Sequence, residues 1–183
     1  MVRFVSLLKK VDEDSVRPIG VTEPLFKVIG LCWLHKLKDK ALRLLSGHQI
    51  GMSSAGAEAL SRAFQMDIED FSHQILSKED STNFFNSLER KNIVVSASLL
   101  RADFAAYTAG VYEAETTYAW DRPLQSSRTF FRTSSGIIQG EALATLLACL
   151  TILTAMVHFS DIFRKNIQMP NLQSKNYPMN ASK

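Results

Sequence analysis

Residues 142–157 read ALATLLACLTILTAMV, and this stretch contains no charged side chain between Glu141 and His158. As a helix it is about 24 Å long at ~1.5 Å per residue, shorter than the ~30 Å hydrocarbon core of a bilayer. Three threonines make the stretch less apolar, although their hydroxyls can bond to carbonyl groups of the same helix. The stretch therefore predicts a helix buried in a protein core, and a single membrane span over 138–159 is the alternative.

The composition is that of a globular protein with a core of its own. The chain has 183 residues, of which 46% are hydrophobic and 21% are charged, as in ordinary folded domains. It contains only 8 Gly and 5 Pro, the residues that favour turns, and a β-sandwich or barrel needs many turns. Cys32 and Cys149 lie in apolar sequence and form no disulfide framework. We therefore expect a reducing, cytoplasmic location.

Charge is unevenly distributed along the chain. Residues 1–50 contain nine Lys and Arg against five Asp and Glu, whereas residues 51–120 contain five against ten. Residues 121–183 return to a positive balance, with seven against three. The acidic middle can be matched by the basic flanks, so the net charge of +3 does not indicate a nucleic-acid partner.

Helix signals cover most of the chain after residue 21. A first helix is predicted from Thr22, a good N-cap residue followed by Pro24, to Gly47 at the C′ position. Shorter helices are predicted at about 54–66, at about 68–77, and from Asp80 or Ser81 to about Lys91.

The most regular pattern is an apolar seam with spacings of four and three residues. Its members are Leu100, Phe104, Tyr107, Val111, Ala114 and Tyr118. Such spacing predicts one continuous helix of about five turns. We expect this helix to pack antiparallel against the apolar segment 137–165, joined to it by a long loop over about 120–136.

Together these patterns predict an all-α fold. It would be a single helical bundle-like domain of about five or six helices, with one central apolar helix. Residues 1–21 would form an irregular N-terminal arm, in which VRFVSLL can add an edge strand or dock as a helical turn. Residues 22–166 would form the helical domain, and 167–183 a flexible C-terminal tail.

Patterns for catalysis, cofactors and metals are weak. The segment 60–76 resembles a helix-turn-helix in its rhythm, but Glu69 and Asp70 would face DNA phosphates. Cys32 and His35 lie three residues apart without a second ligand pair, so no zinc site is predicted. The chain has no nucleophile elbow and no phosphate-binding glycine loop. We therefore predict a non-enzymatic protein without cofactor, metal or nucleic-acid ligand.

The segment 122–135 combines arginine with aromatic side chains, the residue types enriched at binding hot spots. The predicted partner-binding residues are Arg122, Arg128, Phe130, Phe131 and Arg132. The alternative is that both phenylalanines are buried and the arginines are solvated or paired with the acidic middle.

The sequence thus predicts a protein–protein interaction module, such as a small adaptor, a chaperone-like subunit or an assembly component. A single-pass membrane protein is the second hypothesis, and an enzyme of unrecognised type is the third.

Overall fold

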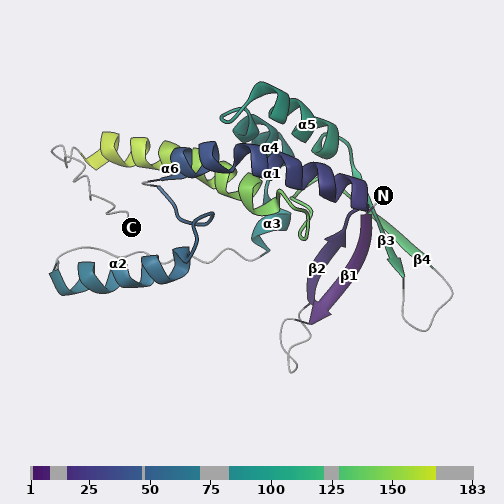
Figure 1. Ribbon diagram of the computed structural model, residues 1–183, viewed down its shortest axis with the longest axis horizontal. Coiled ribbons are helices and arrows are strands. Elements are labelled where there is room, and N and C mark those ends of the chain that lie inside the picture. Colours follow the sequence, from purple (N-terminus) through teal and green to yellow (C-terminus); the bar gives the residue numbers. More distant parts are fainter. Residues whose placement is uncertain (1, 9–15, 47, 71–82, 122–127, 168–183) are drawn as a thin grey trace.

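The computed structural model describes residues 2–8, 16–46, 48–70, 83–121 and 128–167 (Figure 1). The elements, in chain order, are β1 (Val2–Leu8), β2 (Val16–Val21), α1 (Pro24–Leu45), α2 (Gly56–Asp70), α3 (Phe84–Ser87), α4 (Arg90–Ala97), α5 (Ala102–Tyr112), β3 (Thr116–Asp121), β4 (Arg128–Thr133) and α6 (Ala144–Ile167).

The four strands form one mixed sheet in the order β2-β1-β3-β4. The pairs β1–β2 and β3–β4 are antiparallel, whereas β1 and β3 run parallel, with Val2 beside Tyr118. Valine, threonine and aromatic residues favour this extended backbone. Pro18 is tolerated because β2 lies at an edge of the sheet. Figure 1 shows both antiparallel pairs extending away from the helices.

The all-α prediction is wrong, because the described part of the chain combines six helices with this sheet. The segment 1–21, expected to be irregular, contains β1 and β2, and the expected loop over 120–136 contains β4 and the end of β3. The expected long helix ends at Tyr112, so Tyr118 of the apolar seam lies in β3 instead. Its burial comes from the sheet, which a helical periodicity cannot reveal.

The other helices follow the sequence signals to different degrees. α1 begins at Pro24, with Glu23 rather than Thr22 at its N-cap. α2 runs over Gly56–Asp70, somewhat further than the predicted 54–66. Most of the predicted helix over 68–77 lies outside the described residues. Where one helix was expected up to Lys91, the chain forms the single turn α3 and then starts α4 at Arg90.

The core lies around the first half of α6. α4 packs against both α5 and α6, and α1 packs against α6. The buried side chains at this centre are Leu37, Ala41, Leu45, Ile93, Ala97, Leu100, Phe104, Leu143, Leu146, Leu147, Leu150 and Leu153. From Thr154 to Phe159 the side chains of α6 are exposed. The predicted central apolar helix, covered on every side, is therefore wrong as well, because its neighbours leave residues 154–159 exposed.

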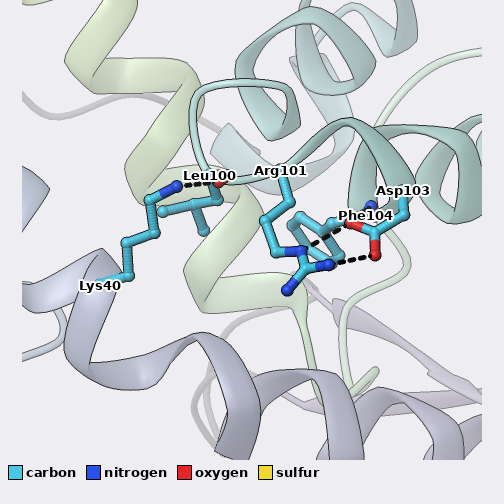
Figure 2. A network of polar contacts seen from close by, with 5 residues as sticks. All are labelled: Lys40, Leu100, Arg101, Asp103 and Phe104. Atoms are coloured by element: carbon cyan, nitrogen blue, oxygen red, sulfur yellow. Dashed lines mark hydrogen bonds and ion pairs between the residues drawn. The ribbon is translucent and has the colours of Figure 1, made fainter.

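A polar network fixes the corner between α4 and α5 against α1 (Figure 2). The Lys40 ammonium of α1 donates to the carbonyl oxygen of Leu100. Arg101 donates to both carboxylate oxygens of Asp103, at 2.8 and 2.7 Å, and this lowers the pKa of Asp103. Asp103 in turn accepts the backbone N–H of Phe104 at 3.0 Å. The first turn of α5 is thus held by a negative charge at its positive end.

Two further predictions concern the membrane and the C-terminal tail. Within the described part of the chain, no helix combines the length and the hydropathy that crossing a bilayer requires. The alternative prediction, a membrane span over 138–159, falls largely on α6, and α6 does not meet this requirement. The predicted tail over 167–183 lies, apart from Ile167, outside the described residues.

Candidate functional site

The predicted partner-binding residues fall on a strand, not on a loop. Arg128, Phe130, Phe131 and Arg132 all belong to β4, the last strand of the sheet within the described residues. Arg122 lies outside the described residues. Because β4 has a strand neighbour on one side only in this sheet, its other side is an edge of the kind that can take up a further strand.

Strand alternation separates these side chains onto two faces. Arg128, Phe130 and Arg132 share one face, which we call the outer face of β4, and Phe131 lies on the other. The register places Val21, Arg3, Ala119 and Phe130 in one row across the four strands. On this face Phe130 is 57% exposed. An exposed aromatic ring between two arginines is therefore the centre of the candidate surface.

Phe131 is tied to the core instead. Its ring stacks on that of Tyr118, with centroids 5.1 Å apart and planes 5° from parallel. Tyr118 is buried, and desolvation raises the pKa of its hydroxyl. The alternative prediction is that both phenylalanines are buried. It holds only in part for Phe131, whose side chain is still 40% exposed, and it does not hold for Phe130.

Arg132 has an acidic neighbour from the middle of the chain. A guanidinium nitrogen of Arg132 lies 3.8 Å from a carboxylate oxygen of Glu115. Both side chains are largely exposed, so the pair is screened by water and contributes little to folding. A partner carboxylate can therefore compete for this arginine at small cost.

A second feature is a cavity of about 360 Å³ between the sheet and the helices. The start of α1, the second half of α5, the start of β3 and the segment before α6 surround it. Glu141, only 8% exposed, lies in its wall and accepts a hydrogen bond from the Tyr112 hydroxyl at 3.3 Å. Burial raises the pKa of Glu141. A Cβ atom at Gly30 of α1 would lie 2.9 Å from this carboxylate, so the glycine makes room for it.

Arg90 is buried behind this cavity. Its guanidinium donates to the carbonyl oxygen of Ala114 at 2.6 Å and to the Thr116 hydroxyl at 2.9 Å. It also donates to the carbonyl oxygen of Gly136 at 3.3 Å. It also lies over the Tyr112 ring, 5.8 Å from the centroid. Burial lowers its pKa. Arg90 thus connects the turn from α5 to β3 with the segment that leads into α6.

Sequence patterns did not single out Arg90, Tyr112 or Glu141. Glu141 was visible only as the charged residue that precedes the apolar run, and Arg90 had no recognisable motif around it. Among the described residues, no group of three or more His, Cys, Asp or Glu side chains is placed to hold a metal ion.

Comparison of the chain with models of known protein families, with curated proteins and with solved structures gives no match.

Proposed function

We propose that this chain is a non-enzymatic protein interaction module that takes up an extended acidic segment of a partner protein along β4. The observation that supports it most is the exposed Phe130 between Arg128 and Arg132 on an edge strand. A partner segment that adds a strand there gains backbone hydrogen bonds, and its side chains decide its specificity. Two arginines on one face favour glutamate or aspartate at alternate positions of that segment.

Exposed apolar surface on other elements supports the same class of function. In the first half of α1, Leu25, Val28 and Leu31 are all at least 49% exposed. All side chains of α2 from Ala57 to Met66 are exposed, although Leu60 and Phe64 give this helix an apolar stripe. Large exposed apolar areas are typical of proteins that bind others. An adaptor or an assembly subunit has such surfaces when its partner is absent.

The cytoplasm is the compartment that we propose for this function. Cys32 is exposed and Cys149 is buried, and both are free thiols. An exposed free thiol is best preserved where the surroundings are reducing.

The test measures binding of a synthetic peptide of alternating glutamate and valine to the full chain. A peptide of alternating lysine and valine, which has the opposite charge, is the comparison. We expect the acidic peptide to bind, the lysine peptide not to bind, and added salt to weaken binding by screening. The double variant Arg128→Glu/Arg132→Glu should bind at least about tenfold more weakly, and so should Phe130→Ala.

Matched controls change similar side chains elsewhere on the surface. Arg43→Glu/Arg62→Glu makes the same change of charge on α1 and α2, and Phe64→Ala removes an exposed ring from α2. Both controls should bind the acidic peptide like the wild type. Equal affinity for the two peptides, or equal loss in the controls, would show that β4 is not the binding strand.

A further inference from the structure

The cavity beside Glu141 has a volume that suits a small molecule. Its volume of about 360 Å³ lies within the range of known ligand pockets. Apolar side chains make up much of its wall, among them Val2, Phe26, Val111 and Ile138. Pockets of this kind bind an apolar body and orient it with a few polar groups.

The charged groups of the wall all have one sign. Glu23, Glu115 and Glu141 line the cavity, and no lysine or arginine does so among the described residues. An anionic ligand would be repelled by these carboxylates, of which Glu115 also pairs with Arg132 outside the wall. A cation would be attracted by them and could also lie against the faces of Phe26 and Tyr107, which line the same cavity.

Glu141 has acceptor positions to spare. Its carboxylate accepts hydrogen bonds from the Tyr112 hydroxyl and from the backbone N–H of Leu143. A carboxylate has about four such positions. An ammonium group beside Glu141 would fill the remaining ones and compensate for the removal of its charge from water.

Gly110 is a position in the wall where a large side chain would fill the cavity. It lies inside α5, where glycine is less favourable than alanine, and a Cβ atom there would meet no described atom within 4 Å. Packing therefore does not require a glycine at this position. Gly110 lines the cavity, so a larger side chain would occupy the space of a ligand.

We propose that this cavity binds a small organic ammonium ion, with its apolar part against Phe26 and Val111 and its ammonium group at Glu141. The ligand differs from the acidic partner segment in charge, and it is placed at Glu141 and not on β4, although Glu115 of the cavity wall lies 3.8 Å from Arg132. The two proposals are tested with different ligands, so each can fail without the other.

The test measures binding of phenethylammonium to the full chain by calorimetry at neutral pH. The comparison ligands are 2-phenylethanol, which replaces the ammonium group by a hydroxyl, and phenylacetate, which is an anion. Phenethylammonium should bind at least about tenfold more tightly than the alcohol, and phenylacetate should not bind. Equal binding of amine and alcohol would overturn the role of the carboxylates.

Two variants locate the site. Glu141→Gln should weaken amine binding at least about tenfold and leave alcohol binding unchanged, whereas Glu113→Gln, an exposed carboxylate outside the cavity, should change neither. Gly110→Leu should abolish binding of both ligands without lowering the melting temperature.

If Gly110→Leu bound the amine with wild-type affinity, the cavity would not be the binding site. If Glu141→Gln failed to fold, Gly110→Leu and the amine–alcohol comparison would still decide the proposal.

Discussion

The two halves of the apolar part of α6, residues 144–153 and residues 154–159, lie in opposite environments. From Ala144 to Leu153 nearly every large apolar side chain is buried, and Leu146 and Leu150 are 0% exposed. From Thr154 to Phe159 the side chains are exposed, Val157 by 42%. At the junction of the two halves, the hydroxyl groups of Ser96 in α4 and Thr154 are hydrogen-bonded at 3.1 Å.

α1 shows the same division in reverse order along the chain. Its second half contributes Leu37, Ala41 and Leu45 to the core, whereas its first half exposes Leu25 and Val28. An apolar side chain is therefore not buried by its chemistry alone, because the elements packed around it decide whether it is covered. The packed region should control stability, and the open region should tolerate change.

The largest expected effect compares one apolar residue from each half of α6. Leu147→Ala should lower the free energy of unfolding by about 2–5 kcal/mol, because it leaves a cavity in a fully packed site. Met156→Ala, at a side chain 42% exposed, should cost less than about 0.5 kcal/mol. Urea denaturation of both variants measures the difference. Equal costs would mean that the second half of α6 is covered in solution.

The next effect concerns a polar group in the packed region. Arg90→Met should cost about 1–3 kcal/mol, because it leaves the buried partners of the guanidinium without a donor. Lys91→Met, at the exposed neighbouring position, is the matched control and should be close to neutral. Denaturation curves again provide the measurement. An unchanged free energy of unfolding in Arg90→Met would show that water can replace the guanidinium.

A smaller effect is a dependence of stability on pH. Burial raises the pKa of Glu141 in the folded chain, so the folded state binds more protons than the unfolded state above the ordinary pKa of glutamate. Stability should therefore fall as the pH rises from that ordinary pKa through the raised one. Glu141→Gln should lack this contribution, while Glu113→Gln should retain it. Identical pH profiles of the wild type and Glu141→Gln would contradict a buried carboxyl group.

The smallest perturbation is chemical labelling of the two thiols, one from each environment. Cys32 lies in the exposed part of α1, whereas Cys149 is 6% exposed and burial raises its pKa. A polar maleimide should label Cys32 at once and Cys149 only when the fold opens locally. Mass spectrometry against time distinguishes the two. Rapid labelling of both thiols would mean that the first half of α6 is not packed as described.

The start of α1 and most of α6 could be predicted from local signals, whereas the sheet and the bounds of the helices between them could not. Pro24 marks the start of α1, and the apolar run marks most of α6, because both signals lie within the element itself. β1 is a strand only through pairing with β2 and β3, and β3 lies more than a hundred residues away. A periodicity that continues to Tyr118 cannot show that the helix ends at Tyr112.

The candidate sites differ in the same way. The cluster of arginine and phenylalanine was visible in sequence because its members are neighbours, although its binding role stays a prediction. The cavity could not be found from sequence, because Glu23, Tyr107 and Glu141 meet only when α1, α5 and the segment before α6 are assembled. Gly110 gave no signal, since a glycine in a helix has many explanations.

The parallel pairing of β1 with β3 has a consequence for synthesis of the chain. Val2 can pair with Tyr118 only after that residue has been synthesised, and at ~5–20 residues per second translation takes roughly 6–23 s to reach it. Until then β1 has only β2 as a neighbour, and an isolated two-stranded pair is marginally stable in water. We expect ribosome-bound chains stalled before Thr116 to be cut in β1 by protease faster than completed chains. β1 is therefore synthesised long before β3, and its place in the sheet is completed only after β3 has been made.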